Sequence, residues 1–207
     1  MRQFTMTLAL TLAPVLAAAQ ASTGVQGETR ARAEISMRRG DEVRIPEGFS
    51  AETRARLEAM VEVARKKSLP TETMTDRMAE GSAKGASETQ VVAATATAMA
   101  QLEASQQALI RGGREHPSDG EVQRGAAAIA RGTTSAQLEA LVRQTPSERR
   151  LEVAFDVLTE LTARGIPVDR ALVAVGGNLS RGASDGQLVS ILGTAQTGLH
   201  LGAARKP

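Results

Sequence analysis

The sequence predicts an all-α protein, and three observations lead to that fold class. Apolar residues recur with the period of amphipathic helices over most of the chain from residue 46 onward. No segment alternates apolar and polar residues long enough to form a half-buried strand. Glycine followed two residues later by serine or threonine, a pattern that ends one helix and begins the next, occurs repeatedly. We therefore expect seven to eight short helices.

One of these helix-ending stretches occurs twice. Residues 84–92 have the sequence KGASETQVV and residues 181–189 have the sequence RGASDGQLV, 97 positions later. The same offset separates Ser68-Leu69-Pro70 from Gly165-Ile166-Pro167. Two landmarks with one offset predict two duplicated halves, arranged either as an α-solenoid-like array of helical hairpins or as an orthogonal bundle.

Within each copy the residues have separate structural roles. The glycine directly follows an apolar-periodic run, where the backbone past a helix end turns left-handed and a Cβ is penalised. The serine caps the next helix, and the glutamine three residues later completes a capping box. Proline can take the place of the cap, because its missing N–H has no partner at a helix start. The expected caps are Gly85, Ser87, Gln90, Gly132, Thr134, Gln137, Gly165, Pro167, Gly182, Ser184 and Gln187.

Helical spacing divides the chain into two halves of one continuous domain, residues 46–112 and residues 113–207. The first half has a long helix capped at Ser50, a shorter one through Met74 and Met78, and a third over residues 91–110. A loop rich in glycine and proline then marks the boundary. The second half has small helices near Val122 and Leu138, then helices over residues 167–181 and 184–197. Between them lies the strongest pattern, opened by Thr145-Pro146-Ser147 and expected to centre the core: Leu151, Ala154, Phe155, Leu158 and Leu161.

The N-terminal residues predict export. Residues 1–21 combine Arg2, an apolar run and Ala19-Gln20-Ala21, which is the pattern of a cleaved secretory signal peptide. The apolar run is shorter than the roughly 20 residues that cross a bilayer, so we expect no transmembrane segment in the mature chain. Residues 22–45 are polar and weakly periodic, as in a flexible tether. The chain has no cysteine, which excludes disulfides, thiol catalysis and an N-terminal lipid anchor.

Composition argues against several classes of partner. The 25 basic and 23 acidic residues nearly cancel, whereas a protein that binds polyanions has a larger excess of positive charge. Only three aromatic residues occur, all phenylalanine, and bases or sugar rings stack on aromatic faces. We expect no nucleic-acid partner and no carbohydrate ligand.

The most regular candidate binding feature is a set of basic residues, each one position before a glycine. In the last turn of a helix, a cation offsets the partial negative charge of the helix C-terminus, which is a purely structural role. Alternatively, stacked repeats bring several of these side chains to one basic edge that binds an anionic partner. The set consists of Lys84, Arg111, Arg124, Arg131, Arg164 and Arg181.

Other candidate sites have ordinary structural explanations. Gly176-Gly177-Asn178 lies inside a predicted helix, where either close helix packing or a ligand cleft explains two glycines. His116 and His200 have no partners at metal-ligand or catalytic spacing. Acidic residues at four-residue spacing, such as Glu152, Asp156 and Glu160, are typical of a solvated helix face. We expect no catalytic, cofactor-binding or metal-binding residues, and no cofactor.

The methionines leave one alternative open. Met60, Met74, Met78 and Met99 occur in the first half, where they either fill the core or line an adaptable apolar groove. The sequence as a whole favours a noncatalytic helical interaction or scaffold protein that is exported to a periplasm or secreted. The alternatives are a carrier of a small apolar or lipid-like ligand between the halves, and an enzyme of unknown chemistry.

Overall fold

The computed structural model describes residues 45–193, which contain helices and turns but no strand. The all-α prediction is therefore confirmed, whereas the signal peptide and nearly all of the tether lie outside the described residues. Within these residues, seven labelled helices follow one another: α2 (Ala51–Lys66), α3 (Glu72–Ala83), α4 (Glu88–Arg111), α5 (Asp119–Ala130), α6 (Ser135–Arg143), α7 (Glu152–Ala163) and α8 (Val168–Ser180). Residues 185–193, after α8, are helical as well.

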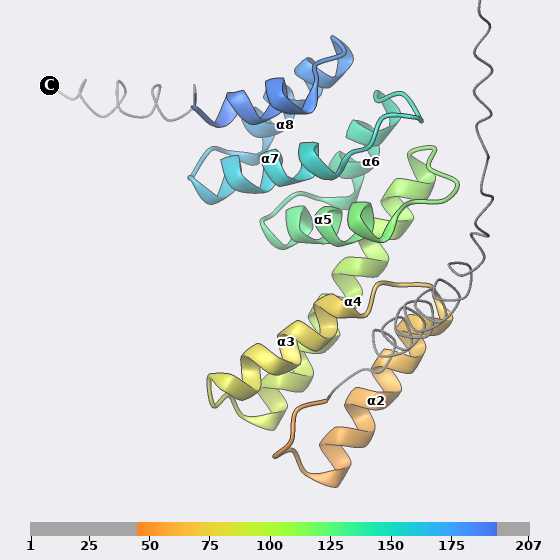
Figure 1. Cartoon of the computed structure of the whole chain (residues 1–207), viewed down its shortest axis with the longest axis vertical. Helices are drawn as coiled ribbons and strands as arrows, with labels where there is room; N and C mark the ends of the chain where they lie inside the picture. The colour runs from red at the N-terminus through yellow and green to blue at the C-terminus, as the bar shows by residue number, and fades with distance from the viewer. Residues whose placement is uncertain (1–44, 194–207) are drawn as a thin grey trace, which may run out of the picture. The chain divides into compact units, whose positions relative to one another are not determined.

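The helices pack in succession along the sequence. α4 is the longest at 24 residues, and it packs against α2, α3, α5 and α6, so it joins the first helices to the later ones (Figure 1). Beyond it, α7 packs against α5 and α8, and α8 also contacts α6. Because each helix packs mainly on near neighbours, the arrangement is that of an array of helical hairpins. A single buried hydrophobic cluster runs through it, from Leu57 to Leu188.

The helix ends lie where the glycine and cap pattern places them. Ser87 accepts a hydrogen bond from the Gln90 amide, and the Gln90 side chain accepts one from the Ser87 amide, so α4 begins with a capping box. Thr134 with Gln137 does the same at α6, and Ser184 with Gln187 before residues 185–193. Pro167 occupies the cap position of α8. The glycines past the helix ends are left-handed, with φ of 66° at Gly85, 102° at Gly132, 85° at Gly165 and 75° at Gly182.

Helix ends recur at two spacings. α2 and α7 end 97 residues apart, at Lys66 and Ala163, and α3 and α8 end 97 residues apart, at Ala83 and Ser180. A shorter period of 33 residues relates the starts of α5, α7 and the helix at residue 185. The recurrence agrees with a repeat architecture, while descent of the two halves from one duplicated segment stays a prediction.

Acidic residues at helix starts connect one helix to another. The Glu88 carboxylate, at the first position of α4, accepts hydrogen bonds from the Ser50 amide at 2.7 Å, the Ser50 hydroxyl at 2.5 Å and the Thr53 hydroxyl of α2. Glu152 of α7 likewise accepts from the hydroxyl of Ser118, the cap of α5, at 3.0 Å. These side chains hold the starts of neighbouring helices together. They therefore do more than acidic residues that only face the solvent.

This link at Glu88 gives a pH-dependent prediction. Hydrogen bonds from Ser50 and then Thr53 hold the pKa of Glu88 below its ordinary value of 4.5. A lowered folded-state pKa adds stability that is present above the ordinary pKa and is lost as pH falls through the lowered value. We expect Glu88→Gln to speed amide exchange in the first turn of α2 at neutral pH. Between about pH 6 and pH 3, the protection of these amides should fall less in the variant than in the unaltered protein. Equal pH dependence in both proteins would contradict this role.

The start of α7 differs from expectation. The helix begins at Glu152 rather than near Pro146, and residues 147–149 form a turn. The buried Arg114 guanidinium donates to the carbonyl oxygens of Ser147 and Arg149, and these bonds hold that turn in place. The Leu151 amide donates to Glu121 at 3.2 Å. These contacts come from the loop and helix about 33 residues earlier, so local sequence does not show them.

The expected core centre is confirmed. Phe155 and Leu158 of α7 are fully buried, and so are Leu151 and Ala154. Elsewhere the helices approach closely through small residues, most tightly where Gly125 of α5 faces Ser105 of α4. A Cβ on Gly125 would overlap the Ser105 hydroxyl and lie 3.2 Å from Leu138 Cδ2. The three helices therefore meet at a point where only glycine fits.

Candidate binding site

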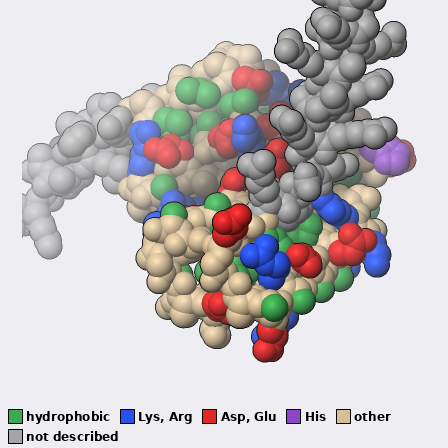
Figure 2. Space-filling model, turned by 60° about the horizontal axis from the view of Figure 1, so that its bottom comes forward, with side chains coloured by type: hydrophobic (Ala, Val, Ile, Leu, Met, Phe, Trp, Pro, Cys, Tyr) green, Lys and Arg blue, Asp and Glu red, His purple; other side chains and the backbone are tan. Residues whose placement is uncertain are grey.

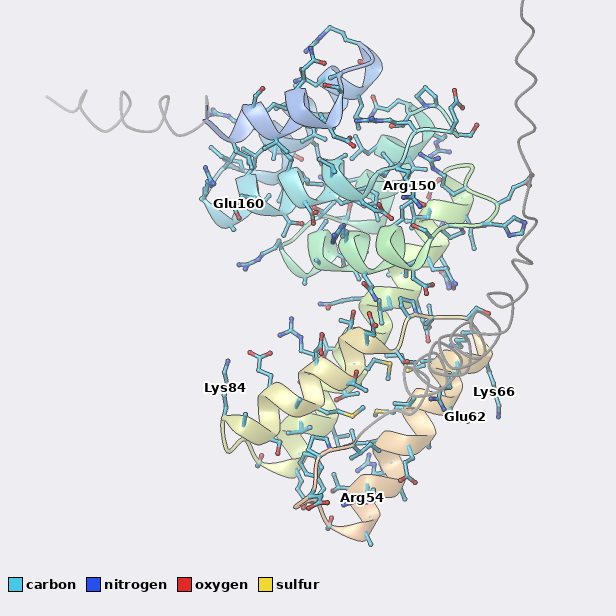
Figure 3. All side chains as sticks on the ribbon, in the orientation of Figure 1. Arg54, Glu62, Lys66, Lys84, Arg150 and Glu160 are labelled. Carbon is cyan, nitrogen blue, oxygen red and sulfur yellow. The ribbon has the colours of Figure 1, made fainter. Side chains whose placement is uncertain are left out.

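Four of the six basic residues that precede glycines form ion pairs. Lys84 pairs with Glu80 at 2.6 Å, Arg111 with Glu139 at 3.0 Å, Arg124 with Asp156 at 3.2 Å and Arg164 with Glu160 at 2.7 Å. Figure 3 shows Lys84 at the end of α3 and Glu160 on α7. Acidic and basic side chains are interspersed on the face in Figure 2, with no single basic patch. Within residues 45–193, Arg131 and Arg181 are the members of the set without an ion pair.

Arg181 belongs to a pocket of about 440 Å³ beside the end of α8. We call it the α8 pocket, and its lining residues are Asn178, Arg181, Ala183, Gln187, Ser190 and Ile191. The sequence points to three of these for other reasons: Asn178 for the glycine pair before it, Arg181 as a helix-end cation, and Gln187 for its capping box. The structure brings them to one site.

Hydrogen bonds fix the polar walls of the α8 pocket. The Asn178 amide group donates to the Ala174 carbonyl at 2.8 Å, and the Gln187 side-chain oxygen accepts from the Ser184 amide at 2.8 Å. The Ser190 hydroxyl donates to the Gln187 carbonyl at 2.7 Å. Within the described part of the protein, the Asn178 side-chain oxygen, the Gln187 side-chain NH₂ and the Arg181 guanidinium have no such bond. The pocket therefore offers one acceptor, one neutral donor and one cationic donor.

The two glycines of α8 have different surroundings. A Cβ on Gly176 would lie 3.3 Å from Leu141 Cδ1 and 3.4 Å from Gln144 Nε2, so this glycine permits close packing against α6. A Cβ on Gly177 would meet only Arg181 Nη1, at 3.6 Å. Packing thus explains Gly176, whereas Gly177 leaves open space beneath the arginine.

A second pocket, of about 560 Å³, lies between the loop after α4 and the loop before α7. Its lining includes Arg114, His116, Glu121, Glu148 and Arg150, and Figure 3 shows Arg150 in the second loop. Arg114 and Glu121 are buried, and their hydrogen bonds go to the backbone of residues 118 and 147–151. The sequence predicts Glu121 as the capping acid of α5, and the structure confirms that capping box with Ser118. The sequence gives no sign of the role of Arg114, which is only a charged residue next to two glycines, or of the bond between Glu121 and the Leu151 amide. The pair fixes the two loops, so it has a structural role.

Within the described residues, the titratable residues considered in the sequence lie at the surface or bind other side chains of the protein. His116 is exposed, and Glu152, Asp156 and Glu160 each bind a side chain of the protein. Partial burial raises the pKa of Asp156, while Arg124 opposes that change. Among residues 45–193, no group of three or more acidic or histidine side chains is placed to hold a metal ion. His200 lies outside the described residues.

The methionines of the first half fill space in the core. Met74 and Met78 of α3 are fully buried in the hydrophobic cluster. Met60 of α2 and Met99 of α4 are half-buried against the same cluster. Neither pocket described above has a methionine in its lining.

Comparison with known proteins does not assign this chain to a family. No family model, no curated protein and no solved structure matches this sequence. Within residues 45–193, no helix has both the length and the apolar character needed to cross a membrane.

Proposed function

We propose that this protein is an exported, noncatalytic interaction protein that binds another polypeptide through the outer surface of its helix array. The observation that carries the proposal is the succession of helices with recurring ends, which pack on near neighbours and are joined by hydrogen bonds and ion pairs between helices. Such arrays present extended surfaces that proteins use for binding. Export to a periplasm or secretion is part of the proposal and rests on the signal sequence in residues 1–21.

The outer side of α6 and α8 is the best-supported surface for that contact. Val173 of α8 is 76% exposed, more than any other large apolar side chain of the described residues. Gln137 of α6 donates to Asp169 of α8 at 2.9 Å, which fixes the register of the two helices. Val173 follows Asp169 by four residues, and Ala140, three residues after Gln137, is also exposed. A large exposed apolar side chain offers area that a partner side chain can bury on binding.

The alternatives have less support. A carrier needs an apolar cavity, and apolar cavities that hold drug-sized ligands have about 300 Å³ or more. The methionines that were candidates to line one pack in the core or against it, and both pockets have mainly polar linings. An enzyme needs convergent acid, base or nucleophilic groups, and the acidic groups described above are already engaged in structural contacts.

A capture experiment tests the proposed function. The full-length protein is expressed in its source cell with a C-terminal tag, recovered from the envelope or medium, and cross-linked to its neighbours. We expect the secreted form to begin at Ser22 and to retain a specific partner polypeptide. Val173→Asp is expected to lower recovery of that partner about tenfold or more, because a central apolar contact is lost.

Val63→Asp is the matched control, since Val63 is an exposed valine of α2, 41% accessible and far from α8 in the sequence. It should leave recovery unchanged. Equal recovery by Val173→Asp and the unaltered protein would contradict the proposed surface. Recovery of the protein only from the cytoplasm with residues 1–21 intact would contradict export.

A further inference from the structure

We propose that the α8 pocket binds the carboxylate of a polypeptide, either an acidic side chain or the carboxyl terminus, with Arg181 as the group that binds it. The inference rests on the proposed binding role and adds the chemistry of one contact. It starts from a difference between two positions that the 97-residue offset makes equivalent, the ends of α3 and α8.

At the end of α3 the cation is neutralised within its own helix. Lys84 lies 2.6 Å from Glu80, one turn earlier, and Arg77 lies 2.8 Å from the other oxygen of the same carboxylate. Hydrogen bonds from Lys84 and then Arg77 hold the pKa of Glu80 below its ordinary value. The residue after Glu80 is Gly81, where a Cβ would lie only 2.8 Å from Val91 Cγ2. At the end of α3, therefore, both nearby cations are paired with a carboxylate and the space beside Gly81 is filled.

At the end of α8 the position equivalent to Glu80 holds no acidic residue. Gly177 stands where Glu80 stands in α3, and Arg181 stands where Lys84 stands. Within the described residues, the Arg181 guanidinium has no ion pair and lies over the open side of Gly177. The acid on the next helix, Asp185, is held by Arg149 at 2.5 Å. A positive charge is therefore left at the pocket without a carboxylate to neutralise it.

The rest of the lining suits a carboxylate that belongs to a polypeptide. A guanidinium binds a planar carboxylate through two parallel N–H bonds, which a single ammonium cannot do. Asn178 has a side-chain oxygen to accept from a peptide N–H, and Gln187 has an NH₂ group to donate to a peptide carbonyl. The side chain of Ile191 adds an apolar contact. These groups match a carboxylate next to an amide better than a bare inorganic ion.

The test uses N-acetyl-alanyl-alanine as the carboxylate probe and its C-terminal amide as the neutral probe. Titration of the full-length protein, followed by ¹H–¹⁵N spectra, is expected to shift the amides of residues 178–191 with the acid and not with the amide. Arg181→Gln should weaken binding of the acid about tenfold or more, as expected for the loss of a charged hydrogen bond. Arg181→Lys should weaken it less, because the charge remains and the paired donors are lost.

Arg131→Gln is the matched control. Arg131 is the other helix-end arginine of the set without an ion pair among the described residues, and it also precedes a left-handed glycine. It should leave binding unchanged, and thermal midpoints of all variants check that they fold. Equal weakening by Arg131→Gln, equal binding of acid and amide, or no saturable shift in residues 178–191 would overturn the inference. Inorganic phosphate binding as tightly as the acid would overturn the carboxylate assignment. If the probe fails while Val173-dependent capture persists, this inference falls and the proposed function stands.

Discussion

Replacement of Phe155 by alanine is expected to be the most destabilising single change in this protein. Phe155 is the largest of the fully buried side chains, and it lies in the first turn of α7. Truncation of a buried phenylalanine removes apolar contacts and leaves a cavity, which typically costs about 3–5 kcal/mol. For a domain of this size the thermal midpoint should fall by roughly 10 °C. Urea or thermal unfolding monitored by helical circular dichroism measures the effect.

The control is Val173→Ala, which shortens an exposed apolar side chain on the neighbouring helix α8. We expect that variant to unfold within about 0.5 kcal/mol of the unaltered protein, as surface substitutions usually do. Phe155→Leu should fall between the two, because most of the volume stays. A Phe155→Ala protein as stable as the Val173→Ala protein would mean that α7 does not centre the core.

The second large effect is expected at Gly125, where α4, α5 and α6 meet. Any side chain there would overlap Ser105 Oγ, so Gly125→Val should destabilise the fold by about 2–3 kcal/mol through overpacking. The Ser105 hydroxyl is buried without a hydrogen-bond partner in the described structure, so Ser105→Ala alone should be nearly neutral. The double variant should recover part of the loss. A double-mutant cycle of unfolding free energies measures that coupling.

Gly177→Ala is the control for the Gly125→Val variant. Gly177 also lies inside a helix, but a Cβ there meets only Arg181 Nη1 at ordinary contact distance. This variant should gain about 0.5–1 kcal/mol, because alanine favours the helix more than glycine does. If Gly125→Val and Gly177→Ala changed stability alike, close packing at Gly125 would not be the cause.

The sequence predicted the features that depend on near neighbours. Helix ends at Gly85, Gly165 and Gly182 follow from the left-handed conformation that glycine accepts, and the caps at Ser87 and Thr134 need only residues three positions away. The buried stripe through Phe155 follows from helical period alone. Such signals are local, so a single sequence contains them.

The features that sequence reasoning missed depend on contacts between distant segments. Arg114 is buried because it donates to carbonyl oxygens more than 30 residues later, and nothing near Arg114 in the sequence indicates that. The ion pair between Arg111 and Glu139 likewise depends on how α4 meets α6. The lack of an ion pair at Arg181 did have a local signal in the sequence, because a glycine rather than an acidic residue stands one turn before it. That signal became informative only beside the Glu80–Lys84 pair of α3.

The most direct test of the account places an acid where α3 has one. Gly177→Glu should pair with Arg181 as Glu80 pairs with Lys84, and the open side of Gly177 has room for the side chain. In titrations with N-acetyl-alanyl-alanine, we expect Gly177→Ala to bind like the unaltered protein and Gly177→Glu to bind about tenfold more weakly or worse. Both variants should keep thermal midpoints at or above that of the unaltered protein. Equal binding of the acid by Gly177→Glu and Gly177→Ala would contradict the claim that an unpaired Arg181 forms the binding site.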